Sequence, residues 1–490
     1  MRTVTFDPAV LDALGVPLGS VSLDSRGVAP GDLFLAFPGE RSDGRAFIGQ
    51  AIERGAAAVL WDPDAFAWDA RWSVPHAPVA RLRTFAGEIA ACVYGQPSEH
   101  LWVAGVTGTN GKTSCSHWIA RSLQRCGRKA AVMGTLGNGF PGSLAPSTHT
   151  TADPVTVQRQ LRALADQGAQ AVAMEVSSHA LDQGRVAGVR FATALFTNLT
   201  RDHLDYHGDM TAYGEAKARL FLMRDLANAV INVDDQFGRE LVARIDRTRT
   251  RVLTYGIGHG DISGRDVSVS TRGVELRIRS PWGDAALRSR VIGGFNVSNL
   301  LGVLGVLITA NLPLDEAIDA LAQVEPVAGR FDMLRMPGAP LVVVDYAHTP
   351  DALEKALETL RELVGHVTGA RLFCVFGCGG DRDPGKRPVM GEIATRLSDL
   401  AIITSDNPRS EDPRAIVAQI AAAAGPNHET EVDREAAIVQ ALRLAGENDV
   451  VLIAGKGHET TQEIGGQRFA FDDLEVARRT LREGREGTHV

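Results

Sequence analysis

The stretch Gly105-Val-Thr-Gly-Thr-Asn-Gly-Lys-Thr-Ser114 decides the fold that we predict for this chain. It lies between an apolar run, Leu101 to Val106, which predicts a buried strand, and a helical pattern from Cys115 to Cys126. A glycine-rich turn between strand and helix directs backbone N–H groups and the positive helix end towards one point, where a phosphate binds. We therefore predict a phosphate-binding loop within a mostly parallel α/β sheet.

Two side chains of this loop carry its expected chemistry. Lys112 would reach the terminal phosphates of a nucleotide, and the Thr113 hydroxyl would hold Mg²⁺. The usual spacing places a glycine at position 106, where this chain has Val106. An ordinary glycine-rich turn is the alternative interpretation, but Gly-Lys-Thr at a helix start favours the phosphate loop.

Length and composition limit the classes of protein to consider. A chain of 490 residues is too long for one core and predicts about three domains. Hydrophobic and charged contents of 44% and 22% describe a soluble globular protein, and the net charge of −8 argues against a nucleic-acid-binding surface. The N-terminus shows no apolar signal region, and the longest apolar run, Leu300 to Ala310, is too short for a bilayer. We expect a cytoplasmic protein without a membrane or nucleic-acid partner.

The cysteines predict no metal site. They are five in number and lack paired metal-ligand spacing; they are Cys92, Cys115, Cys126, Cys374 and Cys378. Buried thiols are the favoured interpretation of the last two, which lie in or beside a predicted strand. This usage suits a reducing compartment.

Breaks at Gly95-Gln-Pro-Ser-Glu-His100 and Met336-Pro-Gly-Ala-Pro340 divide the chain. We predict three α/β domains: a small N-terminal domain (1–98), a central phosphate-loop domain with a mostly parallel sheet (99–333), and a C-terminal doubly wound, Rossmann-like domain (334–490). The predicted N-terminal strands and helices are Ser20–Leu23, Asp32–Phe37, Ala58–Trp61, Phe47–Arg54 and Leu82–Tyr94. Residues 251–290 indicate several short strands, for which an antiparallel addition to the sheet is one arrangement. The C-terminal strands are predicted at Leu341–Asp345, Leu372–Phe376, Leu400–Thr404 and Val450–Ile453.

Three further segments carry candidate functional groups. Glu175 ends the apolar run Ala171 to Met174, where a carboxylate beside a phosphate loop can bind Mg²⁺. The segment Phe196-Thr-Asn-Leu-Thr-Arg-Asp-His-Leu-Asp-Tyr-His207 places His203 as a possible metal ligand, with a polar turn as the equal alternative. Lys217, within Ala-Lys-Ala-Arg-Leu-Phe221, would by itself be a surface lysine of a helix.

Together these motifs resemble the Mur ligase family. The matching segments occur in order over the whole chain: the phosphate loop, Glu175-Val-Ser-Ser-His179, Thr197–Asp205, Ala216–Phe221, Asn296-Val-Ser-Asn299, Gly329-Arg-Phe-Asp332 and Asp345-Tyr-Ala-His-Thr-Pro350. The resemblance implies an enzyme that uses ATP to join an amino acid to a cell-wall peptide precursor. Asp406-Asn-Pro-Arg409 is typical of members that add meso-diaminopimelate to a UDP-sugar dipeptide ending in D-glutamate.

The resemblance implies ATP and two Mg²⁺ ions as cofactors and assigns residues to them. Lys112, Lys217, Glu175 and His203 would be catalytic, with Lys217 carrying a carbamate, and the metal ligands would be Thr113, Glu175, His203 and the modified Lys217. Asn296 and Asn299 would lie beside the adenine, and Arg330 and Asp345 would contact the nucleotide from the domain junction. With the phosphate loop, the residues expected to bind ATP are Gly108, Thr109, Asn110, Gly111, Lys112, Thr113, Ser114, Asn296, Asn299, Arg330 and Asp345.

The resemblance also implies where the other two substrates bind. The UDP-sugar dipeptide would contact the first two domains through Leu23, Ser25, Glu40, Arg41, Ser42, His149, Thr150, Thr151, Ser177, Gln183 and Arg185. His149 departs from the asparagine that is common in relatives, and Ser25 could equally be a turn cap. The diaminopimelate pocket would lie at the strand ends of the last domain and include Arg382, Asp406, Asn407, Pro408, Arg409, Gly455 and Glu459.

The implied reaction forms an acyl phosphate from ATP and the D-glutamyl carboxylate, which the amine of diaminopimelate then attacks. Three other functions remain as alternatives: the L-lysine-adding equivalent, a folylpolyglutamate-type ligase and a nucleotide-binding regulatory switch. A dinucleotide loop at Gly377 to Gly380 is disfavoured by its spacing. The expected partners are small-molecule substrates, and a monomer is expected.

Overall fold

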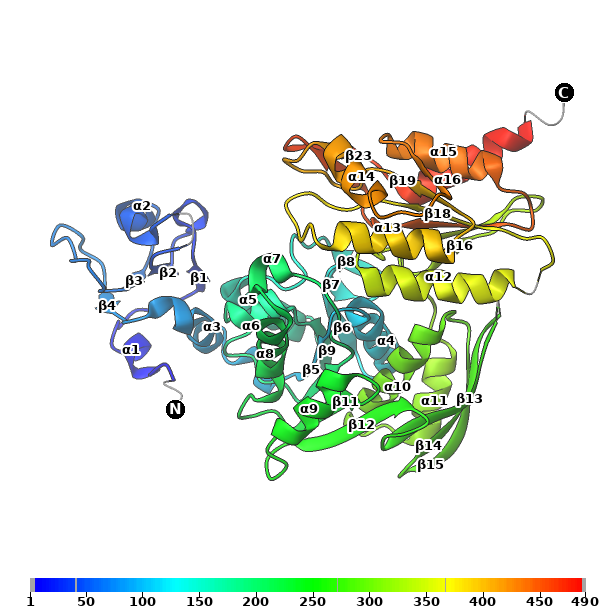
Figure 1. Ribbon diagram of the computed structural model, residues 1–490. Coiled ribbons are helices and arrows are strands. Elements are labelled where there is room, and N and C mark those ends of the chain that lie inside the picture. Colours follow the sequence, from blue (N-terminus) through cyan, green and yellow to red (C-terminus); the bar gives the residue numbers. More distant parts are fainter. Residues whose placement is uncertain (1–4, 40–41, 271, 366, 487–490) are drawn as a thin grey trace.

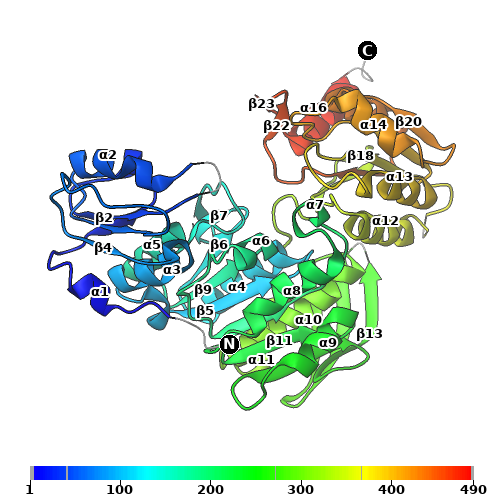
Figure 2. The same ribbon diagram turned by 60° about the vertical axis from the view of Figure 1, so that its left-hand side comes forward.

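The computed structural model describes residues 5–39, 42–270, 272–365 and 367–486. Three larger β-sheets follow one another along the chain, each with helices packed against it (Figure 1). The N-terminal domain lies to one side of the central domain, and the C-terminal domain lies above the central domain in both views (Figures 1 and 2). The predicted three-domain α/β architecture is confirmed.

The N-terminal sheet has four parallel strands in chain order. They are β1 (Ser20–Ser22), β2 (Asp32–Ala36), β3 (Ala58–Trp61) and β4 (His76–Pro78), with helices α1 (Ala9–Asp12), α2 (Ile48–Glu53) and α3 (Leu82–Val93). The three predicted strands are confirmed, whereas β4 was missed because its three residues include a proline at an edge. Helix α3 packs against both this sheet and the central domain, so the two cores adjoin.

The central sheet has eleven strands in the order β15-β14-β13-β12-β11-β10-β5-β9-β6-β7-β8. The strands are β5 (Trp102–Thr107), β6 (Ala130–Gly134), β7 (Gly137–Phe140), β8 (Ser143–Ala145), β9 (Ala171–Glu175), β10 (Thr193–Phe196), β11 (Asn228–Asn232), β12 (Arg251–Ile257), β13 (Ile262–Ser270), β14 (Gly273–Ser280) and β15 (Gly283–Ser289). Strands β5, β6 and β9–β13 are parallel, and antiparallel strands extend both edges. The predicted antiparallel addition within 251–290 is confirmed for β14 and β15, which follow β13 at this edge.

Helices cover both faces of this sheet. They are α4 (Lys112–Arg125), α5 (Pro154–Asp166), α6 (Ser178–Asp182), α7 (Leu204–His207), α8 (Met210–Phe221), α9 (Gln236–Arg244), α10 (Gly294–Thr309) and α11 (Leu314–Ala322). One core lies beneath α4, α10 and α11, and the other beneath α5, α8 and α9. Helix α10 is apolar around most of its circumference because it is almost wholly buried. Within the described residues, no helix combines the length and apolar content that crossing a membrane requires.

The C-terminal sheet has the order β16-β17-β21-β18-β19-β20, parallel except for β16. Its elements are β16 (Asp332–Leu334), β17 (Leu341–Asp345), β18 (Leu372–Phe376), β19 (Leu400–Ile403), β20 (His428–Thr430), β21 (Val450–Ala454), α12 (Pro350–Val364), α13 (Lys386–Leu397), α14 (Pro413–Ala421), α15 (Arg434–Leu444) and α16 (Asp473–Glu486). A separate hairpin, β22 (Thr461–Ile464) and β23 (Gln467–Ala470), packs beside the loop that follows β19. Because β16 pairs with β17, the expected boundary after residue 333 falls inside a strand of this sheet.

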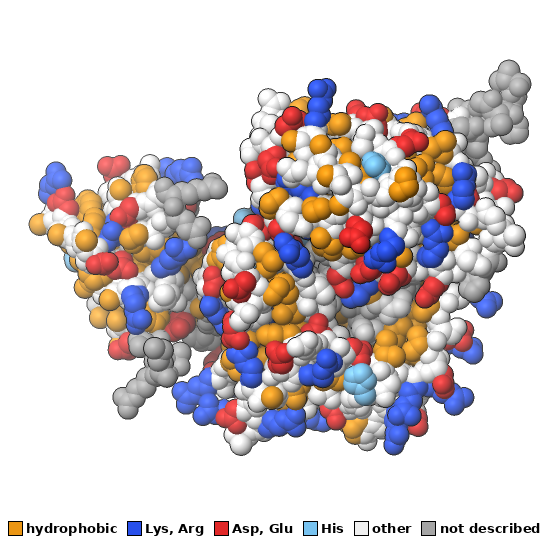
Figure 3. Space-filling view, viewed as in Figure 1, with side chains coloured by type: hydrophobic (Ala, Val, Ile, Leu, Met, Phe, Trp, Pro, Cys, Tyr) orange, Lys and Arg blue, Asp and Glu red, His pale blue; other side chains and the backbone are white. Residues whose placement is uncertain are grey.

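Charged side chains of both signs are interspersed over the face shown in Figure 3, on all three domains. Inside the C-terminal domain one ion pair is fully buried: Arg434 binds Asp473 at 2.8 Å and so ties α15 to α16. The guanidinium also donates to the carbonyl oxygens of Ser405 and Ala454, so each of its three nitrogens makes at least one hydrogen bond.

Candidate active site

The glycine-rich loop after β5 has the conformation that a phosphate loop needs. Gly108 and Gly111 have φ values of 148° and 85°, which L side chains rarely adopt. A Cβ on Gly108 would lie 1.9 Å from Thr197 Oγ1, and one on Gly111 would lie 2.5 Å from Asn299 Oδ1. Val106, at the position where a glycine is usual, is buried inside β5. The departure from the usual spacing therefore falls in the strand and leaves the turn intact.

Lys112 and Thr113 begin helix α4 and face a cavity of about 730 Å³ between the central and C-terminal domains. The Lys112 ammonium donates to the Gly108 and Thr109 carbonyl oxygens at 2.9 and 2.8 Å. Burial lowers the pKa of Lys112 from its usual value, against the opposing effect of Glu175. The Thr113 hydroxyl donates to Glu175 Oε2 at 2.9 Å and accepts from Arg330 at 3.0 Å.

Most residues predicted to bind ATP line this cavity. They are Thr109, Asn110, Gly111, Lys112, Thr113, Ser114, Asn296, Asn299, Arg330 and Asp345. Gly108 does not line it but supplies the carbonyl that holds Lys112. The Arg330 guanidinium stacks over the Tyr346 ring at 4.3 Å, so a residue of the domain junction reaches the phosphate loop.

Glu175 ends β9 with its carboxylate in the same cavity. Its Oε1 accepts from the Thr135 backbone N–H at 2.9 Å, while Oε2 accepts from the Thr113 hydroxyl. A hydroxyl and a carboxylate that converge in this way are the oxygen ligands that suit Mg²⁺. Across the described ranges, no group of three or more His, Cys, Asp or Glu side chains is arranged to hold a metal ion.

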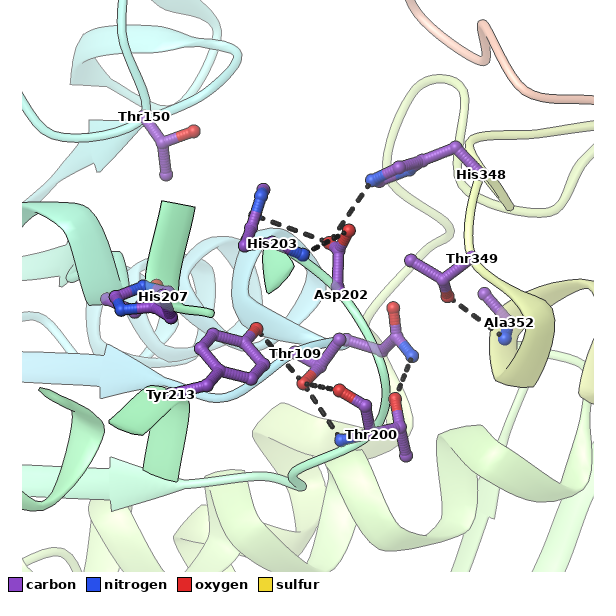
Figure 4. A network of polar contacts seen from close by, with 12 residues as sticks. Thr109, Thr150, Thr200, Asp202, His203, His207, Tyr213, His348, Thr349 and Ala352 are labelled. Carbon is purple, nitrogen blue, oxygen red and sulfur yellow. Dashed lines mark hydrogen bonds and ion pairs between the residues drawn. The ribbon is translucent and has the colours of Figure 1, made fainter. Parts of the chain in front are cut away.

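His203 lies across the cavity and pairs with a residue that the sequence analysis did not select. Figure 4 shows His203 and His348 on either side of Asp202, whose Oδ2 lies 3.3 and 3.7 Å from their Nε2 atoms. Burial lowers the pKa of His203 to about 3, so its imidazole is neutral at pH 7. Burial alone would raise the pKa of Asp202, but the two histidines outweigh it and hold that pKa well below its usual range.

Lys217 of α8 is not the surface lysine that its local sequence indicated. It is 1% exposed, and its Nζ donates to the Gly108 carbonyl at 2.8 Å and lies 4.4 Å from the centre of the Tyr213 ring. Burial and the neighbouring Lys112 lower its pKa well below the usual value. Both lysines thus share one carbonyl at the phosphate loop, and burial shifts Lys217 towards its neutral form.

The residues predicted to bind the UDP-sugar dipeptide divide into two groups. In the central domain Thr150 and Ser177 line the first cavity. Thr151 donates to the Glu175 carbonyl, and Arg185 donates to the Thr151 carbonyl at 2.9 Å and to Gln183. His149 is exposed and pairs with Thr148, outside this network.

The N-terminal group is not brought to the cavities. Ser25 is buried and donates to Gln50 Oε1 at 2.6 Å; Asp24, not Ser25, caps the following turn. Leu23 packs against the N-terminal core, and Ser42 is exposed. Glu40 and Arg41 lie outside the described residues. None of the three described residues lines the two cavities named here.

A second cavity, of about 830 Å³, lies between the C-terminal domain and the central domain. Of the predicted diaminopimelate residues it is lined by Arg382, Asn407, Arg409 and Glu459. Asp406, Pro408 and Gly455 do not line it. They lie just behind it, where a Cβ on Gly455 would meet the Asp406 carboxylate at 2.6 Å and one on Gly380 would meet the Pro408 carbonyl at 1.9 Å. The glycines at Gly377 and Gly380 therefore allow two strand-end loops to pack closely.

Two residues that shape this cavity escaped the sequence analysis: Arg468 lines it, and Lys456 supports a lining residue from behind. Lys456 is fully buried and binds Glu459 Oε2 at 3.0 Å, which holds that carboxylate beside Asn407. Arg468 of β23 adds a third guanidinium from the C-terminal domain. Arg409 itself has a φ of 54° and is fixed by the hairpin, because its backbone N–H donates to the Glu463 carbonyl at 3.0 Å.

Polar contacts join the central and C-terminal domains beside the first cavity. Arg201 pairs with Asp383 at 3.1 Å, and Asn110 of the phosphate loop donates to Asp351 at 2.9 Å. Thr135 lines both cavities, so the two spaces meet at the end of β6. A group held in the second cavity can therefore approach a phosphate held in the first.

Cys374 and Cys378 are buried thiols, as predicted. Cys115, Cys374 and Cys378 are buried, and burial raises the pKa of Cys378 to about 12. Cys92 and Cys126 are half-buried. A thiol with a raised pKa is a poor nucleophile, and the three buried cysteines belong to the hydrophobic cores.

Comparison with known proteins agrees with the geometry. Three family models match in succession: "Mur ligase family, catalytic domain" over residues 18–94, "Mur ligase middle domain" over 106–307 and "Mur ligase, glutamate ligase domain" over 329–457. A UDP-N-acetylmuramoyl-L-alanyl-D-glutamate--2,6-diaminopimelate ligase of Chromobacterium violaceum is 55% identical, covering 97% of both chains. A ligase of the same name from Neisseria meningitidis serogroup B is 50% identical, and the match covers 94% of both chains.

Solved structures give the same result for the fold. The structure of a UDP-N-acetylmuramoyl-L-alanyl-D-glutamate--2,6-diaminopimelate ligase superposes with a TM-score of 0.69 at 38% identity, covering 96% of both chains. A folylpolyglutamate synthase of Mycobacterium tuberculosis, complexed with ADP and AMPPCP, has a TM-score of 0.64 at 19% identity and covers 81% of this chain and 94% of its own. The second likeness concerns the fold alone.

Proposed function

The chain belongs to the Mur ligase family, and we propose that it adds meso-diaminopimelate to UDP-N-acetylmuramoyl-L-alanyl-D-glutamate with hydrolysis of ATP to ADP and phosphate. It is a ligase that forms an amide bond between a carboxylate and an amine. The observation that carries the proposal is the junction at Thr135 between a phosphate-loop cavity and a cavity lined by arginines. This arrangement can bring an activated carboxylate and an amino acid together.

The reaction begins when the γ-phosphoryl group of ATP passes to the D-glutamyl carboxylate, which yields ADP and an acyl phosphate. The amine of diaminopimelate attacks the acyl carbon, and phosphate leaves the tetrahedral intermediate. Because two anions meet in the first step, positioning and charge stabilisation dominate the catalysis. We assign the charge stabilisation to Lys112 and Arg330, which both face the first cavity.

Two Mg²⁺ ions complete the proposed site, and the donor set fits them in part. Thr113 and Glu175, whose oxygens lie 2.9 Å apart, would hold one ion; His203 and a carbamate on Lys217 would hold the second. Bound Mg²⁺ would supply positive charge to the phosphate oxygens. The lowered pKa of the buried Lys217 amine supports the carbamate, since the uncharged form of an amine can form an N–C bond to CO₂ and lose a proton to solvent.

We assign the remaining residues to substrates according to the cavity that they line or adjoin. Asn296, Asn299 and Asp345 would contact the nucleotide, while Thr150, Thr151, Ser177, Gln183 and Arg185 would hold the peptide end of the UDP-sugar substrate. Leu23, Ser25 and Ser42 would bind its nucleotide end if the N-terminal domain approaches. Arg382, Asn407, Arg409 and Glu459 would bind diaminopimelate. We further propose a monomer that acts in the cytoplasm.

The alternative functions are less well supported. A nucleotide-binding switch would leave the arginine-lined cavity without a ligand. A folylpolyglutamate-type ligase shares the fold, but the similar structure covers only part of this chain at low identity. A lysine-adding ligase would have no carboxylate to pair with Arg409, because L-lysine carries one carboxylate where diaminopimelate carries two.

Arg409→Lys is expected to weaken diaminopimelate use selectively. The guanidinium fork binds a carboxylate in a bidentate manner that an ammonium cannot reproduce. Each charge-assisted hydrogen bond contributes about 1.5–3 kcal/mol, so the KM for diaminopimelate should rise roughly tenfold to a hundredfold. Steady-state kinetics with each substrate varied in turn would measure this. Arg414→Lys, at an exposed position of α14, is the matched control; an equal rise in the KM for the UDP-sugar dipeptide would contradict the assignment.

A further inference from the structure

The arginine-lined cavity has a second wall, which the assigned roles do not use. This wall belongs to the central domain and comes from α4 and the loops around β6–β8, which lie beneath the C-terminal domain in Figure 1. His117 and Arg121 line it from α4. They follow Thr113 by one and two helical turns, so all three side chains share a face of the helix.

Arg121 is suited to bind an anion. It is half-buried at the cavity wall and, among the residues that the structure describes, makes no hydrogen bond or ion pair. Arg125, one turn further along, is exposed, lies outside the cavity and donates to the Gln323 carbonyl. A partly desolvated guanidinium without a partner gains from pairing with a carboxylate.

His117 is independent evidence that a polar group of a ligand binds at this wall. It is 3% exposed, and neither Nδ1 nor Nε2 has a hydrogen-bond partner within the described chain. Burial, Arg121 and Arg330 lower its pKa to about 4, so at pH 7 one ring nitrogen is a free acceptor. Buried polar atoms without partners cost free energy, and a substrate that supplies a donor relieves that cost.

The position of this wall indicates which end of the amino acid it meets. Diaminopimelate carries a carboxylate and an amine at each end. Arg409, Asn407 and Glu459 lie on the C-terminal wall, whereas Thr135, where the two cavities join, lies on the wall of His117 and Arg121. The reacting end must approach the junction, because the acyl phosphate forms in the first cavity.

We propose that Arg121 pairs with the carboxylate beside the attacking amine of diaminopimelate and that His117 accepts a hydrogen bond from that amine. The inference rests on the ligase activity proposed above. It gives the central domain half of the amino-acid subsite, so the substrate is held from both domains. His117 and Arg121 then orient the nucleophile towards the acyl phosphate.

Arg121→Gln tests the carboxylate pairing. We expect the KM for meso-diaminopimelate to rise roughly tenfold to a hundredfold, with the KM values for ATP and the UDP-sugar dipeptide unchanged. Acyl-phosphate formation, measured by trapping with borohydride without amino acid, should stay at the wild-type level, which also reports that the variant folds. Arg125→Gln is the matched control on the same helix and should leave all values unchanged.

His117→Phe removes the acceptor at similar volume, and His117→Gln restores one. The first should raise the KM for diaminopimelate and lower kcat, and the second should recover part of both. An unchanged KM for diaminopimelate in Arg121→Gln would overturn the inference. So would a rise confined to the UDP-sugar dipeptide, which would assign Arg121 to the D-glutamyl carboxylate. Wild-type protein that releases no ADP in response to diaminopimelate would instead contradict the proposed function itself.

Discussion

Replacing Lys112 with alanine is expected to reduce the rate of ligation by at least about a hundredfold while leaving the fold intact. The ammonium lies on the phosphate loop with its Nζ 2.8–2.9 Å from two carbonyl oxygens, in the position from which it can reach a bound phosphate. The charge that builds on the transferring phosphoryl group would lose its nearest cation, and the Thr113 hydroxyl carries no charge to replace it.

The measurement for this variant is ADP release in the presence of all three substrates. Lys129→Ala, which removes an exposed lysine of the same domain, is the control and should retain full activity. Circular dichroism and thermal unfolding would confirm the fold. A Lys112→Ala protein with a rate near that of wild type would show that the loop is not the ATP site.

Lys217→Ala is expected to lose at least about a hundredfold in rate for a different reason. The variant lacks the amine that would carry the carbamate, and thus one proposed oxygen ligand of Mg²⁺. A short carboxylic acid added in solution should restore part of the activity, because the space left by the side chain can admit an oxygen ligand. Bicarbonate at high concentration should not, since no amine remains to react with CO₂.

Lys112→Ala is the matched control for this rescue, and carboxylic acids should not restore it. Native mass spectrometry should show the mass of one added CO₂ on the intact wild-type protein and none on Lys217→Ala. A bare Lys217 amine in an active, metal-loaded enzyme would disprove the carbamate and leave the buried lysine with another role.

The phosphate loop could be predicted from sequence because all of its determinants are local. A strand, a glycine turn and a helix start follow within a few residues, and each has its own pattern. The doubly wound C-terminal domain was predictable for the same reason, since its buried parallel strands are continuous apolar runs. The edge strands β4 (His-Ala-Pro) and β16 (Asp-Met-Leu) were missed, because neither alternates polar and apolar residues as the equally short β1 (Ser-Val-Ser) does.

Contacts between distant segments could not be predicted in this way. Asp202 stood in a segment already selected for its histidines, but its pairing with His348 depends on how the central and C-terminal domains meet. The burial of Lys217 is set by packing of α8 against the phosphate loop, which its local sequence does not reveal. Arg468 and Arg121 are likewise ordinary surface-type residues in sequence and become candidate binding residues only through the cavity that they line.

The most direct test of the central claim is ADP release by the wild-type protein with ATP, Mg²⁺ and UDP-N-acetylmuramoyl-L-alanyl-D-glutamate, with meso-diaminopimelate and L-lysine compared as the amino acid. We predict that release requires the UDP-sugar dipeptide and an amino acid together. A site built to pair a second carboxylate discriminates against a substrate that lacks it, so kcat/KM should favour diaminopimelate by up to about 10⁴. Comparable kcat/KM values for the two amino acids, or ADP release that needs neither substrate, would contradict the account.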